Sequence, residues 1–538
     1  MNLIWLLLRE SWASAIASLV TGSISGASAA GIIAIVNATL NETPLPQTLL
    51  VGGFVFLCLV QFVTRIASQI LLSHLGNGIS LKLRILLSQR ILASSLRHLE
   101  EIGAPTLMAS LTEDITSITT AIVIIPFFCG NIAIVVGCVI YLGLLSWKVL
   151  LIFLVTLFFS IFIIQFLQLK GFAALQSVRK EQDRLFAHYK TLTEGIKELK
   201  LHGDRRQAFL KEDLKLTAIS LRNQQVAGEK FFAVGASVAN TLLFLGVGVL
   251  LFILPSIQTV SIAIISSYVL TLIYLNNYLT GILQFLPGLS RAKIALDKID
   301  RLGLQLEENA ENPVTSTNNF NSSWQSLQLK EVTHSYRGEK EDRGFILGKI
   351  NLSFTAGELV FIVGGNGSGK STLAKLITGL YIPESGKIIL DRQPINDENR
   401  DRYRDYFTAV FSDFYLFDRL LGLNDIDARA KEYLEKLQLD RKVKIVDGVL
   451  STTDLSQGQR KRLALLTAYL EDRSIYLFDE WASDQDPIFK KTFYKELLPE
   501  LKSKGKTVFV ISHDDRYFEV ADRIIKLDYG QVVEDRYL

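Results

Sequence analysis

The chain has 538 residues, which is enough for roughly three or four domains of ordinary size. Its composition is 49% hydrophobic and only 21% charged, with a mean hydropathy of +0.28. That balance is too apolar for an ordinary soluble protein and too polar for a chain made only of membrane spans. The 57 basic and 54 acidic residues leave a net charge of +3, which excludes a disordered chain and a basic nucleic-acid-binding arm.

Stretches that are long and apolar enough to cross a bilayer occur repeatedly in the first half of the chain. A span needs about 20 mostly apolar residues. Six stretches meet this length, approximately at 12–37, 47–75, 115–145, 149–169, 231–254 and 259–286. The sequence therefore predicts a membrane α-helical domain with six transmembrane helices.

Basic residues gather in two long polar segments, one after the second apolar stretch and one after the fourth. The first segment carries Lys82, Arg84, Arg90 and Arg97, and the second carries nine more between Lys170 and Arg206. The positive-inside rule places both segments and both termini on the cytoplasmic side of a plasma membrane. Apolar residues recur at helical spacing in both, which predicts helices that continue spans two to five into the cytoplasm.

The composition changes abruptly after the sixth stretch. Residues 304–325 are polar and rich in Asn and Ser, as expected for a linker. Beyond them, short β-like runs alternate with helical patterns, which is typical of an α/β domain. We therefore predict a transmembrane domain at 1–303, a linker at 304–325 and an α/β P-loop nucleotide-binding domain at 326–538.

A phosphate-binding loop lies in the second half of the chain. The strand-like run ELVFIV leads into a GxxxxGK[ST] motif and then into a helical pattern, a context that disfavours a simple Gly-rich turn. Backbone N–H groups of the loop would surround phosphate oxygens, Lys370 would reach the β- and γ-phosphates, and the Ser371 hydroxyl would ligate Mg²⁺. The predicted ATP-binding residues are Gly364, Asn366, Gly367, Ser368, Gly369, Lys370, Ser371 and Thr372.

Two further segments suit nucleotide chemistry. The hydrophobic run SIYLF ends in Asp479 and Glu480, which suits a buried strand that delivers one carboxylate to the Mg²⁺ shell and a second as general base for the attacking water. Between the two motifs, Ser456 and Gly458 open a helical pattern and form a second phosphate-binding device. One nucleotide does not need two such devices from one copy of the chain.

Residues 454–462, DLSQGQRKR, resemble the signature sequence of the ATP-binding cassette (ABC) family, with Gln457 where the family has glycine. In that family the signature of one subunit closes over ATP held by the P-loop of another. The resemblance thus implies a dimer in which Ser456, Gln457, Gly458 and Gln459 contact ATP.

The resemblance extends to four other positions. His513 is similar to the switch histidine that contacts the γ-phosphate, Asp486 to the aspartate that crosses the dimer interface, and Tyr336 to the aromatic residue that stacks on adenine. Where the family has a glutamine that touches Mg²⁺, this chain has Ser412, a candidate ligand through its hydroxyl or a water, followed by Asp413.

Six spans and one C-terminal cassette together resemble a half-size ABC exporter. This implies an ATP hydrolase coupled to transport by alternating access, working as a homodimer. Three segments, TEGIKELKLHGDRR, VFSDFYLFDRLLG and FDEWASDQDP, resemble the bacterial cyclic-peptide exporters, a group that includes the pyoverdine and syringomycin exporters. The cargo implied is a cyclic nonribosomal peptide or a peptide siderophore.

The membrane half offers its own candidates for cargo contacts. Gln61, Arg65 and Gln69 recur every four residues on one face of the second span, and an intramembrane charge normally faces a cavity or a partner. Arg65 either meets an anionic group of the cargo, or reaches the lipid headgroups, or pairs inside the bundle. Tyr274 and Asn277 of the sixth span form a polar aromatic surface that suits either the cavity or an interfacial belt.

Other classes of protein share parts of this pattern. A lipid or multidrug ABC exporter would carry every cassette motif, and an ATP-gated channel or regulator would bind ATP without hydrolysis-driven turnover. An importer half is disfavoured because spans and cassette are fused. A leader-cleaving exporter is disfavoured because the spans begin at once. No nucleic-acid partner is expected.

Overall fold

The computed structural model describes residues 12–41, 46–257, 261–308, 310–311, 324–336, 345–423 and 426–538. The chain separates into two compact units. The first comprises Met1–Leu86 and Met108–Arg301, and the second comprises Leu87–Leu107 and Leu302–Leu538. Most of the linker predicted at 304–325 lies outside the described residues, although a helix runs through its first residues to Glu308.

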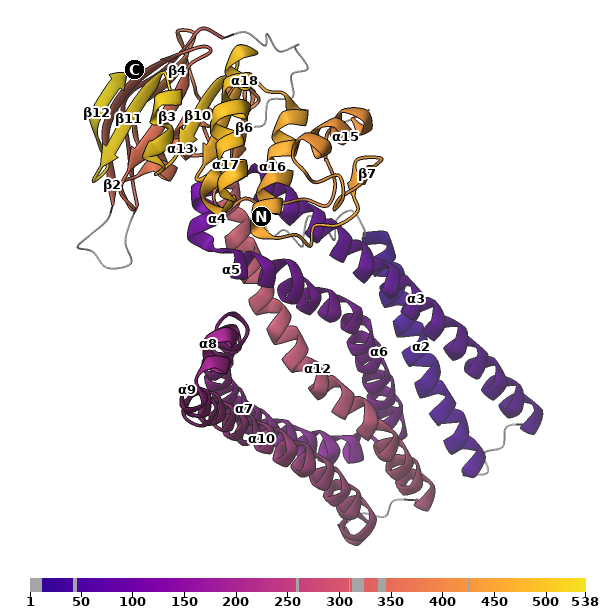
Figure 1. Cartoon of the computed structure of the whole chain (residues 1–538). Coiled ribbons are helices and arrows are strands. Elements are labelled where there is room, and N and C mark those ends of the chain that lie inside the picture. Colours follow the sequence, from indigo (N-terminus) through magenta and orange to yellow (C-terminus); the bar gives the residue numbers. More distant parts are fainter. Residues whose placement is uncertain are drawn as a thin grey trace. The chain divides into compact units, whose positions relative to one another are not determined.

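The first unit consists of long helices joined by short connectors (Figure 1). Its long helices are α2 (Trp12–Leu40), α3 (Gln47–Ala93), α6 (Ile115–Leu145), α7 (Trp147–Glu194), α10 (Lys215–Gly248) and α12 (Ile262–Glu308). Its shorter helical segments are η1 (Ser110–Asp114), α8 (Ile196–Leu201), α9 (Gly203–Ala208), η2 (Phe209–Leu214), η3 (Val249–Ile253) and α11 (Leu254–Ile257). The boundary between the two units falls inside α5 (Ala104–Ala109), whose first four residues belong to the second unit.

The helices of this unit suit a membrane by length and composition. Among the described residues, five of them are long and apolar enough to cross a bilayer, and α7 contains the remaining predicted stretch at 149–169. Helices α3 and α12 have 47 residues each and α7 has 48. At 1.5 Å per residue each is about 70 Å long, whereas the hydrocarbon core is about 30 Å thick. Each of these three helices is therefore longer than the hydrocarbon core is thick, and the extension of spans two to five into the cytoplasm stays a prediction.

Small residues and buried polar contacts hold the bundle together. Helix α2 packs on α6, where a Cβ atom at Gly26 would lie 2.9 Å from the Cβ of Ala133, so the two helices approach closely at this glycine. Helices α7 and α10 run side by side (Figure 1). The buried Tyr268 hydroxyl lies 2.6 Å from the carbonyl oxygen of Leu142 and 2.7 Å from that of Ser146. These contacts satisfy polar groups where lipid supplies none.

The second unit is an α/β fold. Its helical segments are α4 (Leu96–Ile102), α13 (Lys370–Ile377), α14 (Arg400–Arg404), α15 (Asp427–Lys436), α16 (Gln457–Glu471), η4 (Trp481–Asp484), α17 (Pro487–Thr492), η5 (Phe493–Leu497), α18 (Leu498–Ser503) and η6 (Asp515–Val520). Its strands are β1 (Ser326–Ser335), β2 (Ile346–Thr355), β3 (Leu359–Gly364), β4 (Ser385–Leu390), β5 (Gln393–Pro394), β6 (Phe407–Val410), β7 (Ile445–Val446), β8 (Val449–Leu450), β9 (Ile475–Asp479), β10 (Thr507–Ile511), β11 (Arg523–Asp528) and β12 (Gln531–Tyr537).

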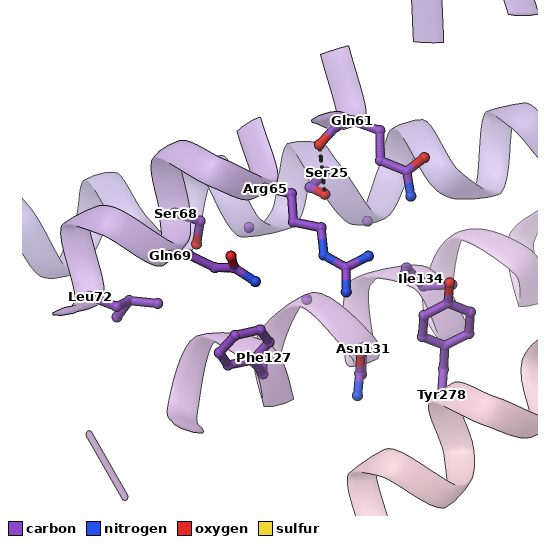
Figure 2. Close-up of a pocket in the computed structure, with 13 residues that line it drawn as sticks. Ser25, Gln61, Arg65, Ser68, Gln69, Leu72, Phe127, Asn131, Ile134 and Tyr278 are labelled. Atoms are coloured by element: carbon purple, nitrogen blue, oxygen red, sulfur yellow. Dashed lines mark hydrogen bonds between the residues drawn. The ribbon is translucent and has the colours of Figure 1, made fainter. Parts of the chain in front are cut away.

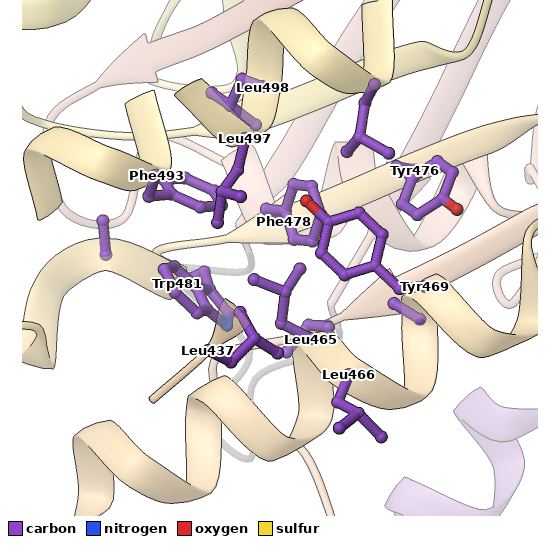
Figure 3. Packing of buried hydrophobic residues seen from close by; sticks show 14 of the residues in the cluster. Leu437, Leu465, Leu466, Tyr469, Tyr476, Phe478, Trp481, Phe493, Leu497 and Leu498 are labelled. Carbon is purple, nitrogen blue, oxygen red and sulfur yellow. The ribbon is translucent and has the colours of Figure 1, made fainter. Parts of the chain in front are cut away.

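A six-stranded sheet in the order β12-β11-β3-β10-β9-β6 forms the centre of this unit. Its strands are parallel except for β12. Alternate residues of β9 enter two different hydrophobic clusters, Tyr476 and Phe478 in one and Ile475 and Leu477 in the other. Because side chains of a strand alternate between faces, the sheet is buried on both sides. Figure 3 shows the cluster built on Tyr476, Phe478 and helix α16.

Residues Leu87–Leu107 belong with the second unit, whereas the sequence placed them in the domain at 1–303. Polar contacts explain this assignment. Glu100 of α4 accepts hydrogen bonds from the Tyr381 hydroxyl and, at 2.8 Å, from the Lys375 ammonium. Arg97 forms an ion pair of 2.6 Å with Glu384. The end of the first cytoplasmic extension is therefore fastened to the α/β fold.

Candidate functional site

Four adjacent parallel strands bring most of the predicted ATP-site residues to one edge of the central sheet. The P-loop follows β3, Asp479 ends β9, His513 lies two residues after β10, and Ser412 lies two residues after β6. The strand order β3-β10-β9-β6 makes these strands neighbours. Ligands of parallel α/β sheets bind at the carboxyl ends of the strands.

The P-loop requires glycine where its backbone turns. Gly364, Gly367 and Gly369 have φ angles of +147°, +76° and +101°, a region that side chains with a Cβ atom rarely enter. At Gly364 a Cβ atom would also lie 2.2 Å from the carbonyl oxygen of Leu527. Because these glycines have no side chains, a phosphate group can approach the backbone of the loop closely.

Lys370 begins α13 and turns back over the loop. Its ammonium donates hydrogen bonds to the carbonyl oxygens of Gly364 at 3.0 Å and Gly365 at 2.9 Å. Burial lowers the pKa of Lys370, and the negative charges of Glu480 and Asp479 oppose that shift. The cation therefore lies within the field of both carboxylates, at the start of the helix.

Asp479 has an oxygen atom that suits a metal ion. The residue is 1% exposed, and its Oδ1 atom has no hydrogen-bond partner among the residues that the structure describes. Burial raises the pKa of the Asp479 carboxyl, while a hydrogen bond from the Ser371 side chain lowers it. A buried, uncommitted carboxylate oxygen beside a P-loop hydroxyl is the oxygen donor set that Mg²⁺ prefers, so these residues fit the predicted ion.

Glu480 and His513 lie together next to this carboxylate. Glu480 Oε1 is 3.1 Å from His513 Nε2, and both side chains are partly exposed. The backbone N–H of Glu480 donates to the carbonyl of Ile511, the last residue of β10. Glu480 has φ +51°, a left-handed conformation that is strained for a residue with a side chain. The fold thus holds this carboxylate in a fixed position beside the histidine.

The turn after β6 contributes a residue whose role the sequence did not assign. Ser412 is exposed in this turn. Burial is the main cause that raises the pKa of Asp479, and the negative charge of Asp413 adds a small contribution in the same direction. Asp413 therefore lies within electrostatic reach of the predicted metal ligand. The one signal in the sequence that points to Asp413 is its position directly after the candidate serine.

Tyr336 has an exposed ring and an anchored hydroxyl. The residue is 39% exposed, and its ring also packs against the rings of His334, Phe345 and Tyr381, so one part of the side chain is open to a base. Its hydroxyl donates to the Tyr381 hydroxyl at 3.0 Å, and the Thr372 hydroxyl donates to it at 3.4 Å. Tyr381 in turn donates to Glu100. A continuous set of hydrogen bonds therefore joins the residue after the P-loop serine to α4.

The signature segment is a well-formed helix start. Ser456 is the N-cap of α16 and forms a capping box with Gln459, while Gln457 is exposed. A Cβ atom at Gly458 would lie 2.8 Å from the carbonyl oxygen of Asp484. In the described part of the chain, no hydrogen bond or ion pair joins this segment to the P-loop.

Asp486 occupies the start of α17. Its carboxylate accepts hydrogen bonds from the backbone N–H groups of Ile488 and Phe489, and it pairs with Arg462 at 2.5 Å. The backbone hydrogen bond from Phe489 is the main cause that lowers the pKa of Asp486. The carboxylate is therefore charged and held at the surface, and its predicted contact across a dimer interface remains a prediction.

A small cavity lined by both polar and apolar residues lies between the membrane helices (Figure 2). Its volume is about 60 Å³, and its polar lining includes Gln61, Arg65 and Gln69 of α3, Asn131 of α6 and Tyr278 of α12. Figure 2 shows Arg65 reaching toward the helices that carry Asn131 and Tyr278. The structure thus groups three of the predicted cargo residues. Tyr274 and Asn277 are not among the lining residues. Tyr274 accepts a hydrogen bond of 2.8 Å from the Tyr278 hydroxyl and packs against the Tyr278 ring, whereas Asn277 is exposed.

Comparisons with known proteins agree with this division of the chain. A family model described as ABC transporter transmembrane region matches residues 11–283, and one described as ABC transporter matches residues 347–483. The chain is 38% identical over 529 residues to the ATP-binding protein SyrD of Pseudomonas syringae pv. syringae, covering 96% of this chain and 93% of that protein.

A more distant relative and a solved structure also match most of the chain. An ATP-dependent lipid A-core flippase of Ralstonia nicotianae is 27% identical, over 89% of this chain and 82% of its own length. The solved structure of a bacterial Atm1-family ABC exporter with ATP bound has a TM-score of 0.73 at 16% identity, covering 98% of this chain and 95% of its own. That likeness establishes the fold of the whole chain.

Proposed function

Because the chain belongs to the ABC transporter family, we propose that it uses ATP to export a peptide across the bacterial plasma membrane. The family makes it a multi-pass membrane protein and an ATPase coupled to transport. The observation that carries the proposal is one chain in which membrane helices are joined to a P-loop with Asp479, Glu480 and His513 around it. Both termini and the α/β unit would lie in the cytoplasm.

The residues at the sheet edge have different roles in ATP hydrolysis. The P-loop backbone and Lys370 bind and orient the phosphates. Ser371, Asp479 and Ser412 would hold Mg²⁺, which when bound supplies charge stabilisation for the phosphate oxygens. Glu480 takes the proton of the attacking water as general base, and His513, 3.1 Å away, fixes the orientation of that carboxylate.

The working unit is proposed to be a homodimer with two composite ATP sites. The signature residues Ser456, Gln457, Gly458 and Gln459 would contact ATP on the P-loop of a second copy. Two observations support this: no described contact joins the signature to the P-loop of its own chain, and a second phosphate-binding helix start has no use for a single copy. Tyr336 would stack on adenine, and Asp486 would contact the partner.

The cargo is proposed to be a cyclic nonribosomal peptide or a peptide siderophore. The segments that resemble the cyclic-peptide exporters support this class, as does the 38% identity to SyrD over nearly the whole chain. A lipid is the alternative, because flippases are among the more distant relatives. ATPase activity in nanodiscs separates the two. We expect stimulation by an acylated cyclic peptide, while stimulation only by lipid A-core would favour the lipid alternative.

Arg65 is proposed to bind an anionic group of that cargo. None of the six apolar stretches contains an acidic residue, so the spans offer no counter-ion to this guanidinium. An unpaired charge at membrane depth is costly and generally functional. The cavity of about 60 Å³ has room for a carboxylate or a few water molecules but not for a whole peptide, so Arg65, Gln61 and Gln69 would bind one group of a larger ligand.

The Arg65→Ala variant tests this contact. We expect the peptide concentration that half-saturates ATPase stimulation to rise at least about tenfold, because hydrogen bonds to charged groups contribute about 1.5–3 kcal/mol. Arg65→Lys, which keeps the charge, should retain most of the affinity. Unchanged stimulation of Arg65→Ala by an anionic peptide would exclude the role.

The Glu480→Gln variant tests the hydrolytic mechanism. Without a general base, hydrolysis should fall by about 10²–10⁴-fold, while the P-loop still binds ATP. We therefore expect ATP to remain bound and the variant to accumulate as closed dimers, detectable by cross-linking in the presence of Mg²⁺ and ATP. Hydrolysis at the wild-type rate would exclude Glu480 as the base.

A further inference from the structure

A buried lysine links the signature helix to the catalytic carboxylate of the same chain. Lys461 lies in the second turn of α16 and is 2% exposed. Its ammonium donates to the backbone carbonyl of Glu480 at 2.9 Å and to the Ser483 hydroxyl at 2.9 Å, and it pairs with Asp484 at 2.7 Å. An ammonium has three donor hydrogens, so every one has a partner between residues 480 and 484.

The segment that Lys461 contacts is the one that has to be held in place. Glu480 has φ +51°, and such strain persists only where the surroundings determine the backbone strongly. The indole N–H of Trp481 donates back to the Lys461 carbonyl at 2.8 Å. The hydrogen bond from Lys461 is the main cause that lowers the pKa of Asp484. Lys461 therefore donates hydrogen bonds to the segment at 480–484 through its side chain and accepts one from that segment at its backbone carbonyl.

We propose that Lys461 is the positioning residue of Glu480: its hydrogen bond to the Glu480 carbonyl fixes the strained peptide and so the direction of the catalytic carboxylate. A buried charge whose partner is removed is strongly unfavourable, so the contact resists breaking. The proposal rests on the proposed function, because it assigns to Lys461 a part in the hydrolysis that Glu480 performs.

The chain provides a matched control on the same helix. Lys506 donates to the Asp472 carbonyl at 3.0 Å and pairs with the Asp472 carboxylate at 2.8 Å, at the opposite end of α16. Lys506→Met therefore removes a similar contact from the same helix without touching the segment at 480–484. Any loss due only to a weakened helix would occur in this variant too.

Full-length Lys461→Met is compared with Lys506→Met in nanodiscs. A misplacement of about 1 Å can reduce a rate by about 10²-fold, so we expect the kcat for ATP to fall at least about tenfold in Lys461→Met and less than twofold in the control. The dissociation constant of a fluorescent ATP analogue should change less than twofold in both. Equal kcat values for Lys461→Met and wild type, or equal losses in both variants, would overturn the proposal.

A second readout does not depend on hydrolysis. In nucleotide-free protein, backbone amides at 480–484 should exchange hydrogen at least about tenfold faster in Lys461→Met than in wild type, because the contacts that hold the segment are absent. Unchanged exchange there overturns the positioning role. If wild-type protein hydrolyses no ATP, the proposed function fails, and the exchange measurement still decides whether Lys461 holds this segment.

Mixed dimers test whether Lys461 positions Glu480 of its own protomer or of the other protomer. Lys370→Ala in one protomer leaves a single working P-loop in the other. Adding Lys461→Met to the protomer with the working P-loop should reduce turnover at least about tenfold, whereas adding it to the blocked protomer should reduce turnover less than twofold. An equal loss in both arrangements would contradict positioning of Glu480 within its own chain.

If Lys461→Met does not fold, Ser483→Ala is measured instead, because it loses one of the three contacts of the Lys461 ammonium. We then expect a smaller acceleration of hydrogen exchange at 480–484.

Discussion

Tyr336 combines an exposed ring with a hydroxyl group that the protein already binds. The ring would stack on adenine, whereas the hydroxyl donates to Tyr381 at 3.0 Å. Stacking of a base on an aromatic ring contributes about 1–3 kcal/mol, and an ordinary hydrogen bond about 0.5–1.5 kcal/mol. The two contributions can be separated by substitution because only one of them needs the hydroxyl.

We predict that Tyr336→Ala raises the dissociation constant of ATP about 5- to 150-fold, the range that corresponds to the loss of stacking. Tyr336→Phe, which keeps the ring, should change it at most about tenfold. Equilibrium binding of a fluorescent ATP analogue to the full-length protein measures both. An equal effect of the two substitutions would mean that the hydroxyl, and not stacking, determines affinity.

Asp479 is expected to reduce the stability of the protein that contains no nucleotide. Burial raises the pKa of its carboxyl. At neutral pH the group is charged in both the folded and the unfolded chain, so the folded state bears the cost of the buried charge. As the pH falls through the raised folded pKa toward the ordinary value, the folded carboxyl takes up a proton first and the cost disappears.

Asp479→Asn should therefore raise the melting temperature of the nucleotide-free protein at pH 7.5 by about 2–4 °C, the change that about 1 kcal/mol produces in a unit of this size. The gain should shrink at pH 5. Thermal unfolding of the full chain at both pH values checks this prediction. A gain that grows as the pH falls would contradict a buried charge at this position.

The candidate ATP-site residues could be selected from the sequence because their motifs are contiguous in the chain. The P-loop, the pair Asp479–Glu480 and the signature start at Ser456 are short strings with a fixed relation to a strand or helix end. Lys461 and Glu100 were not identified, because their roles depend on residues distant in the sequence. A lysine inside a helical pattern normally faces solvent, and nothing in the sequence indicates that this one is buried.

Helix α4 is the element that fastens the first cytoplasmic extension to the α/β unit. Glu100 accepts hydrogen bonds from Tyr381 and Lys375, while the neighbouring Glu101 is 58% exposed and pairs with Arg97 one turn away. Exposed pairs of this kind contribute about 0–1 kcal/mol. Of the two adjacent glutamates, Glu100 therefore joins α4 to Tyr381 and Lys375 of the α/β fold, whereas Glu101 pairs only within α4 in the contacts named here.

Glu100→Gln should loosen α4, whereas Glu101→Gln should not. We expect amides of residues 96–102 to exchange hydrogen several-fold faster in Glu100→Gln, since two charge-assisted contacts are weakened. Peptide-stimulated ATPase should fall with little change in the basal rate, because Tyr336 and the P-loop remain in place. Equal exchange in the two variants would mean that α4 is held by its apolar contacts instead.

The elements themselves were predicted with unequal success. The third apolar stretch, 115–145, has the bounds of α6 and ends where the Ser-Trp-Lys connector begins. Its start is not the start of the helix, because helical backbone continues from α5 through η1 into α6. The first cytoplasmic extension was expected as helix continuing from the second span. It breaks after Ala93 into α4 and α5 and joins the second unit, since its contacts to Tyr381, Lys375 and Glu384 are long-range and leave no periodic pattern.

At the scale of the whole molecule, the near-neutral net charge conceals two unlike parts. Within the six apolar stretches, Arg65 is the single Asp, Glu, Lys or Arg residue, while the α/β unit carries Asp479 and Glu480, the carboxylates proposed to act in hydrolysis. Long helices such as α3 and α12 extend beyond the thickness of a bilayer. We propose that such helices carry closure of the nucleotide sites to the membrane domain and so shift it between two states.

ATP-driven uptake of an acylated, anionic cyclic peptide into inside-out proteoliposomes tests the central claim most directly. Wild-type protein should accumulate the peptide inside the vesicles above its external concentration only when Mg²⁺ and ATP are present. Glu480→Gln in the same vesicles should bind ATP and accumulate no peptide. Accumulation by Glu480→Gln at the wild-type rate would contradict an export cycle driven by ATP hydrolysis.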